Sequence, residues 1–287
     1  MTDSSSPHNM FRAMSNDGAF RIISINATDL VRRIFEWQQP PASLEGHFAQ
    51  LLVGAVLVRE TMSPGQRVQA TLKIHGGASL MADAQPKGVT RGLLSNKEEA
   101  GAFELGPTTA LAITRVLFNN ELHQGVVSTE AARGVEGAIS DYFQQSEQVA
   151  SVVRFAVVRD EDGGIRHAGG FVLQLLPEVT TEVLAPMTRK MDFMPAFEDL
   201  FDMFDGDARR VVEWVMEDVE YEVLAQETVL AQCPCSEQRV IAAMTTLGRD
   251  ELQDIVNSGE VMEILCDYCR TVYRIGAQQL KPLLSVS

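Results

Sequence analysis

The sequence predicts an α+β protein, in which a mainly antiparallel sheet domain with helices is followed by a helical linker and a small C-terminal domain. Three observations predict it. Over residues 18–177, strand-like runs are interrupted by helical patterns without strict βαβ order. Residues 178–230 combine acidic side chains with apolar residues at helical spacing. Residues 231–287 hold every cysteine of the chain, whereas residues 1–17 are polar and are predicted to be a disordered tail.

The overall charge restricts the class of partner. The 287 residues carry a formal net charge of −15. Nucleic acids and anionic membrane surfaces bind proteins through lysine and arginine, so neither is expected as a partner. The polar start of the chain lacks the features of a signal peptide, and the longest apolar run, Leu51 to Val58, is too short to span a bilayer. We therefore expect a cytoplasmic location, where thiols stay reduced.

The first elements of the sheet domain follow from periodicity and capping. Residues 20–25 read as a strand. Thr28 or Asp29 can cap a helix that ends before Pro40-Pro41. A second helix is predicted to begin at Ser43. Its apolar face comprises Leu44, Phe48, Leu51, Leu52 and Val56.

Beyond Ser63-Pro-Gly65 the pattern changes to a period of two residues, as expected of a half-buried strand. Gly76-Gly77 predicts a turn, and residues 135–145 fit a further helix. The buried face of the first strand is predicted to comprise Val68, Ala70, Leu72 and Ile74. Other strands are predicted near 80–82, 89–94, 152–158 and 171–175.

The linker, residues 178–230, holds 14 acidic residues against four lysines and arginines. Its apolar residues recur at helical spacing and include Phe197, Leu200, Phe201, Phe204, Val212, Val215 and Val219. One interpretation is a solvated pair of helices packed on the core. The other is a metastable segment, because like charges at helical spacing repel one another and lower local stability.

The four cysteines form two close pairs, Cys233-Pro-Cys235 and Cys266-Asp-Tyr-Cys269, separated by 30 residues. Such pairs turn two thiolates each toward one point and predict one tetrahedral zinc ion with four sulfur ligands. A thioredoxin-type dithiol and four uncoordinated thiols are the alternatives, but the dithiol places its first cysteine at a helix N-terminus. Apolar and β-branched residues at 261–265 and 271–275 instead favour a strand, a zinc knuckle and a second strand.

A metal in this domain can act as a structural clamp or also as a sensor. Only 57 residues remain from residue 231 onward, and units of this size seldom fold without a metal or disulfides. Structural zinc contributes about 10–16 kcal/mol of apparent folding free energy in small zinc domains. Oxidation of two thiolates removes that contribution, so the domain is expected to unfold and the acidic linker beside it to follow.

The cysteine pattern, taken with motifs elsewhere, resembles that of a known family. Cys-x-Cys followed by Cys-Asp-Tyr-Cys near the C-terminus is similar to the heat shock protein 33 family, also called the 33 kDa chaperonins. Residues 141–148 (DYFQQSEQ) and 168–177 (AGGFVLQLLP) are similar to signatures of its N-terminal domain, and residues 89–92 and 124–127 match more weakly. The likeness extends over residues 20–276.

This resemblance implies an ATP-independent holdase of the bacterial cytoplasm. In the family, the reduced protein binds one zinc and is inactive. Oxidation releases zinc, pairs the cysteines and unfolds the linker, after which the protein dimerises and binds unfolding clients. Carried onto this chain, the zinc ligands are Cys233, Cys235, Cys266 and Cys269. The implied disulfides are Cys233–Cys235 and Cys266–Cys269.

Two other classes of protein fit parts of the sequence. An enzyme with a purely structural zinc clamp would need a deep pocket with converging polar groups within residues 20–177. Ser146-Glu147-Gln148 and His123 offer hydrolase-like residues, but no glycine elbow surrounds the serine, and no Gly-x-x-x-x-Gly-Lys loop is present. A zinc-ribbon interaction module would need a basic face, whereas acidic residues outnumber basic ones over 231–287.

Overall fold

The computed structural model describes residues 8–73, 77–97, 109–117, 119, 121–128 and 133–284. The chain divides into two compact units, the first ending at Ala231 and the second beginning at Gln232. The predicted buried residue Ile74 and the first glycine of the predicted Gly76-Gly77 turn lie outside the described residues. The mixed α and β composition confirms the predicted fold class.

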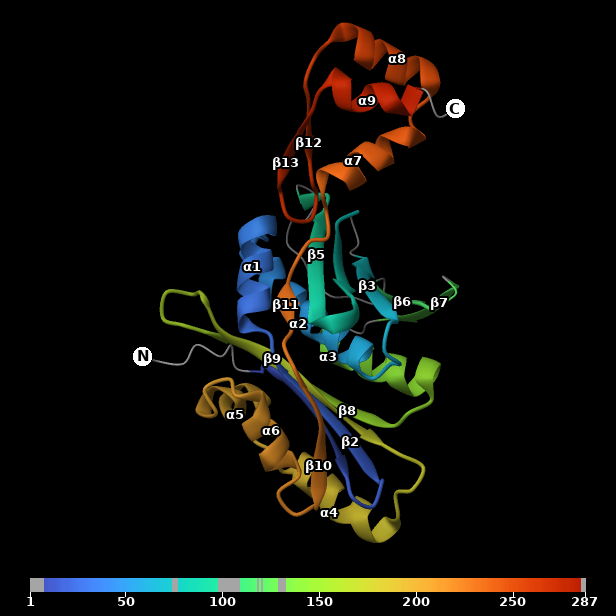
Figure 1. Ribbon diagram of the computed structural model, residues 1–287. Coiled ribbons are helices and arrows are strands. Elements are labelled where there is room, and N and C mark those ends of the chain that lie inside the picture. Colours follow the sequence, from blue (N-terminus) through green and yellow to red (C-terminus); the bar gives the residue numbers. More distant parts are fainter. Residues whose placement is uncertain are drawn as a thin grey trace, which may run out of the picture. The chain divides into compact units, whose positions relative to one another are not determined.

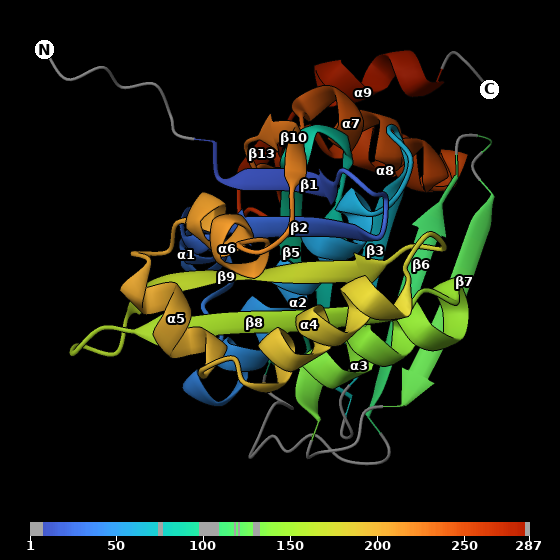
Figure 2. The same ribbon diagram turned by 90° about the horizontal axis from the view of Figure 1, so that it is seen from below.

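A five-stranded antiparallel sheet, counted over the described residues, forms one half of the first unit (Figure 2). Two neighbouring strands at its centre, β2 and β9, are buried along most of their length, because helices cover both faces of the sheet. In spatial order its strands are β10 (Tyr221–Glu227), β1 (Met10–Ser15), β2 (Phe20–Asn26), β9 (Ile165–Leu175) and β8 (Ser151–Arg159).

A second sheet has six strands within the described part of the chain. The predicted alternation of residues 67–73 places Val68, Ala70 and Leu72 on its buried face. Its pairings are antiparallel apart from β11 with β5, which is parallel. The order is β11 (Leu230–Ala231), β5 (Val89–Ser95), β4 (Ser79–Ala84), β3 (Arg67–Lys73), β6 (Ala110–Val116) and β7 (Leu122–Ser128). A short 3-10 turn, Pro86–Gly88, links β4 to β5.

Helices α1 (Thr28–Gln38), α2 (Ala42–Glu60) and α3 (Gly134–Tyr142) lie between the two sheets (Figure 1). From Leu51 to Glu60 every residue of α2 is buried, because the helix contacts strands of both sheets. A π-helical turn, Phe143–Glu147, extends α3. Among the described residues, no helix has the combined length and apolarity needed to cross a bilayer.

The outer face of the five-stranded sheet is covered by helices of the predicted linker, residues 178–230, here called the acidic segment (Figure 2). Its helices are α4 (Thr181–Asp192), α5 (Phe197–Met203) and α6 (Ala208–Val215). The helical linker predicted for the whole of 178–230 needs correction, because residues 221–227 form strand β10 instead. Phe197, Leu200, Phe201, Phe204, Val212 and Val215 are buried as the helical pattern requires.

The N-terminal prediction also needs correction. Residues 10–15 of the predicted disordered tail form strand β1, which lies between β2 and β10. Met10 and Ala13 are fully buried there. The strand is ordered because it bonds to a neighbour on each side, so its backbone groups are satisfied along its length.

The second unit is small and has its own apolar core. It contains α7 (Glu237–Ala243), a 3-10 turn (Met244–Thr246), α8 (Arg249–Ser258), the hairpin β12 (Met262–Leu265) and β13 (Val272–Ile275), and α9 (Ala277–Leu284). Among its described residues, the buried core comprises Met244, Leu252, Ile275 and Leu280. A core of this size gives little stability by itself.

Candidate metal centre

The first cysteine pair is held by the start of α7. Ser236 is the N-cap of this helix, and its hydroxyl accepts a hydrogen bond from the Arg239 backbone N–H at 3.3 Å. The Arg239 guanidinium donates to the Pro234 carbonyl at 2.9 Å. Pro234 also fixes the backbone between Cys233 and Cys235. The helix start thus orients both thiols of this pair.

The second pair lies in the turn that joins β12 to β13. The backbone N–H of Cys266 donates to the Thr271 carbonyl at 2.9 Å, and the Arg270 N–H donates back to the Cys266 carbonyl at 2.8 Å. Arg270 has a φ of 60°, a left-handed conformation that closes the turn. The predicted order of strand, knuckle and strand is therefore present, and Cys269 is turned back toward Cys266.

The structure brings all four predicted cysteines together. Their sulfur atoms lie within 4.8 Å of one another, and each side chain is partly buried. Sγ of Cys233 lies 3.8 Å from Sγ of Cys266, and the Cys235 and Cys269 sulfurs lie 3.3 Å apart. A tetrahedral ion with zinc–sulfur bonds of about 2.3 Å places its sulfur ligands about 3.8 Å apart. The cluster can therefore hold a metal ion, and its soft donors suit zinc.

The four thiols do not share one electrostatic environment. Burial raises the pKa of Cys233 to about 12, and burial also raises the pKa of Cys235. The pKa of Cys269 is lowered to about 7, since hydrogen bonds with Thr271 outweigh the opposing effect of burial. A bound cation would favour the thiolate form of every one of them. Without one, Cys269 ionises before Cys233 and Cys235.

Two hydroxyl groups touch the sulfurs and were not predicted as part of the site: that of Thr271, directly before β13, and that of Tyr273 within it. The Tyr273 hydroxyl donates to Sγ of Cys235 at 3.0 Å, and the Thr271 hydroxyl lies 3.2 Å from Sγ of Cys269. The available signal was their spacing: two residues apart on a predicted strand, they share a face. Only the packing of the hairpin against the segment before α7 shows that this face meets the cysteines.

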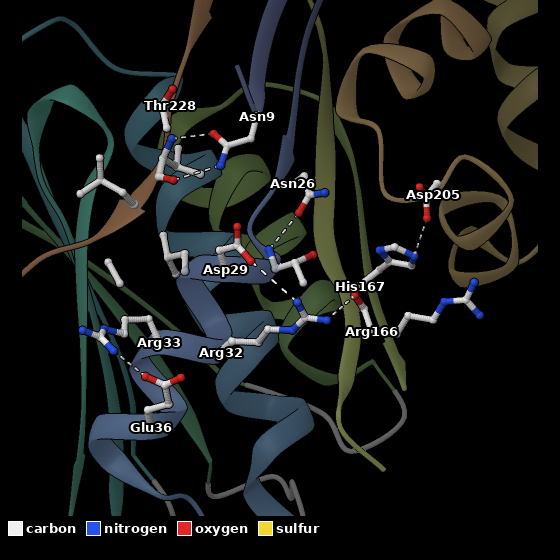
Figure 3. A pocket seen from close by; sticks show the side chains of 15 residues that line it. Asn9, Asn26, Asp29, Arg32, Arg33, Glu36, Arg166, His167, Asp205 and Thr228 are labelled. Atoms are coloured by element: carbon white, nitrogen blue, oxygen red, sulfur yellow. Dashed lines mark hydrogen bonds and ion pairs between the residues drawn. The ribbon is translucent and has the colours of Figure 1, made fainter. Parts of the chain in front are cut away.

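A pocket of about 930 Å³ in the first unit is where an enzyme with a structural zinc clamp would be expected to work (Figure 3). Its arginines are engaged by their surroundings. Arg33 pairs with Glu36 at 2.7 Å, and Arg32 donates to the Ile165 carbonyl at 2.7 Å. These contacts give Arg32 and Arg33 a structural role at the pocket.

Glu147, one of the hydrolase-like residues singled out from the sequence, is likewise engaged by its neighbours. Glu147 accepts a hydrogen bond from the Tyr142 hydroxyl at 2.6 Å and pairs with Arg115 at 2.7 Å. Both of its carboxylate oxygens are thus engaged by neighbours other than His123. This arrangement ties the end of the π-helical turn to strand β6, which is a structural role.

Comparison with known proteins identifies the family. The protein-family model described as Hsp33 protein matches residues 8–276 of this chain. This chain belongs to the Hsp33 family. The 33 kDa chaperonin of Streptococcus pneumoniae strain JJA is 27% identical over 96% of this chain and 98% of its own length. The 33 kDa chaperonin of Streptococcus thermophilus strain CNRZ 1066 is 26% identical over 96% and 99%.

The fold comparison agrees with this assignment. The crystal structure of the 33 kDa chaperonin, or Hsp33 homologue, from Thermotoga maritima superposes with a TM-score of 0.78. It covers 97% of this chain and 98% of its own at 22% identity, so the likeness concerns the fold. The resemblance inferred from the cysteine spacing is confirmed, and the Hsp33 chain described here is a member of a chaperone family.

Proposed function

We propose that this Hsp33 protein is an ATP-independent holdase that binds unfolding proteins and is switched on by oxidation. The observation that carries the proposal is the cluster of four thiols within 4.8 Å, located in a unit with a small apolar core. The unit depends on its cysteines for order, and oxidants attack cysteines. A change in thiol chemistry is therefore also a change in folding stability.

In the reduced state, Cys233, Cys235, Cys266 and Cys269 hold one Zn²⁺. The sulfur separations of 3.3 and 3.8 Å and the four soft donors support this assignment. When bound, the ion contributes folding free energy and keeps the thiols ionised. The chain's own part is to orient the sulfurs through the α7 start and the β12–β13 turn.

Oxidation converts the four ligands into two disulfides, Cys233–Cys235 and Cys266–Cys269. In each, two thiolates form a sulfur–sulfur bond and give two electrons to the oxidant. Hydrogen peroxide then takes up two protons and leaves as two waters, whereas hypochlorous acid takes up one proton and leaves as chloride and water. Disulfide sulfurs are poor metal ligands, so coordination and the stability it gives are lost.

Loss of order in the second unit then spreads to the acidic segment. Helices α5 and α6 bury Phe197, Phe201 and Val212 against the five-stranded sheet, while their outer side carries many acidic residues. Their release exposes this apolar surface and the sheet face beneath it, which includes Phe20 and Phe171. We propose that unfolding clients bind there, that the activated protein is a homodimer, and that it acts in the bacterial cytoplasm.

The test is suppression of thermal aggregation of a model client without ATP, with released zinc followed by a chromogenic chelator. Activity should appear only after oxidation and together with zinc loss. The double substitution Cys266→Ser and Cys269→Ser should release zinc and raise protease sensitivity over 178–230. Zinc loss without chaperone activity would mean that the metal is only a structural clamp and would contradict the proposed redox switch.

A further inference from the structure

The four residues Thr228–Ala231, here called the strap, connect strand β10 to the cysteine unit. Only Gln232 separates the strap from Cys233. The strap therefore lies on the covalent path from the proposed sensor to β10 and the acidic helices α4–α6. Three kinds of contact fasten it within the first unit, namely a side-chain clasp, a backbone pairing and a buried side chain.

The clasp is made by Asn9, whose side-chain amide binds both polar groups of Val229 (Figure 3). Asn9 Nδ2 donates to the Val229 carbonyl at 3.0 Å, and the Val229 N–H donates to Asn9 Oδ1 at 2.7 Å. Asn9 is itself held by backbone bonds to β10 and β2, at Glu227 and Asn26. The Asn9 side-chain amide thus pairs with the backbone of Val229 as a neighbouring strand would, but for this one residue only.

The backbone pairing brings the strap against β5. Leu230 and Ala231 pair in parallel with Val89 and Thr90. The approach requires a glycine at position 88, because a Cβ there would overlap the Thr228 carbonyl oxygen. Gly88 also has a φ of +71°. The side chain of Val229 is 2% exposed and belongs to the main core between the sheets.

The side chains of strand β10 anchor it less firmly than the contacts just described anchor the strap. Glu222, Val223 and Leu224 are exposed, the two apolar ones by 40% and 46%. The strand is held chiefly by its backbone pairing with β1. Exposed edge strands held in this way open readily. The firm attachment between the cysteines and the acidic helices is therefore at Val229.

We infer that the clasp of Asn9 and the close approach at Gly88 set how easily disorder in the cysteine unit spreads to β10 and the acidic helices. The inference rests on the proposed function, because it concerns the step between oxidation and release. While the clasp holds, unfolding of the second unit stops at Gln232. When the clasp opens, β10 has only its pairing with β1 to resist separation.

The test compares clasp variants with matched controls in the reduced, zinc-loaded protein. Asn9→Ala removes both hydrogen bonds, Asn9→Asp replaces the donor by a carboxylate oxygen that faces the Val229 carbonyl, and Gly88→Ala disturbs the approach. Gly163→Ala is the matched glycine control, because Gly163 has a φ of +84° but open space around its Cβ position. Gln124→Ala removes an exposed side-chain amide that donates to Thr114, away from the strap.

Hydrogen–deuterium exchange of peptides covering 216–232 is the primary readout. We expect exchange about tenfold faster in all three clasp variants and unchanged in the controls, since each hydrogen bond contributes modestly. The same clasp variants should suppress client aggregation partly without oxidant while zinc stays bound. Equal exchange in clasp variants and controls would overturn the inference.

The parent protein separates this inference from the proposed function without any substitution. If oxidation speeds exchange at 228–231 but aggregation is not suppressed, the clasp operates and the holdase proposal fails. If the oxidised parent suppresses aggregation while the Val229 amide stays as protected as before, the holdase proposal stands and the clasp is not the gate.

Discussion

The hydroxyl of Tyr273 donates a hydrogen bond of 3.0 Å to Sγ of Cys235. Through this bond, a side chain of β13 supports the cysteine pair that precedes α7, so the two halves of the cluster are linked even without a shared ion. The bond opposes the burial that raises the pKa of Cys235, and it raises the pKa of Tyr273 itself. Tyr273 therefore stabilises Cys235 in its thiolate form.

Tyr273→Phe should weaken zinc binding by about 10- to 100-fold, the usual cost of removing a group that orients a metal ligand. Competition with a chelator of known affinity measures the change. Arg274→Ala is the matched control, because Arg274 is on the opposite face of the same strand, where it pairs with Glu263 at 2.9 Å. An equal loss of affinity in both variants would mean that Tyr273 acts only through the stability of the hairpin.

Thr271→Val should raise the pKa of Cys269 in reduced, metal-free protein whose second unit is kept folded by a stabilising osmolyte. The Thr271 hydroxyl, 3.2 Å from the sulfur, helps to lower that pKa to about 7, and valine keeps the side-chain shape without the hydroxyl. Below the ordinary thiol pKa of about 8.5, less thiolate should form and alkylation should slow. Rates of iodoacetamide modification between pH 6 and 9, assigned to Cys269 by peptide mass, measure the shift; an unchanged profile contradicts it.

Local patterns predicted the parts of this fold that depend on nearby residues. The alternation of Val68, Ala70 and Leu72 predicted β3, and the spacing of Phe197 and Phe201 predicted the buried face of α5. Strands β1 and β10 were missed because they are ordered by each other. Met10 pairs with Glu227, more than two hundred positions away in the sequence, and neither segment alone shows strong alternation.

For the metal centre, too, the sequence predicted the residues that are close in the chain and missed the contacts that depend on tertiary packing. Close spacing within each cysteine pair indicated which sulfurs belong to the cluster, because such pairs have few ways to point apart. The hydroxyls of Thr271 and Tyr273 were not assigned, because their contacts depend on how the hairpin faces the start of α7. The clasp of Asn9 on Val229 is also invisible to local patterns, since an asparagine near the start of a chain gives no signal of a distant partner.

Phe201→Ala should destabilise the packing of the acidic segment on the five-stranded sheet by about 3–5 kcal/mol, the usual cost of truncating a buried aromatic residue. Phe201 is fully buried and packs against Phe197 at a ring distance of 5.5 Å. Limited proteolysis of the reduced protein should show faster cleavage within 178–230. Met203→Ala is the control on the same helix, because Met203 is 64% exposed, and it should leave cleavage unchanged.

Removal of the metal under reducing conditions should unfold the second unit while the core of the first unit around α2 keeps its structure. Among described residues, the core of the second unit has four buried side chains, whereas the first unit has two extensive clusters. A zinc-thiolate site supplies about 10–16 kcal/mol in small domains, so a chelator removes most of what orders this one. Hydrogen exchange after chelation should rise over 232–284 and stay low in α2; retained protection of α8 and β13 would show that the core suffices without metal.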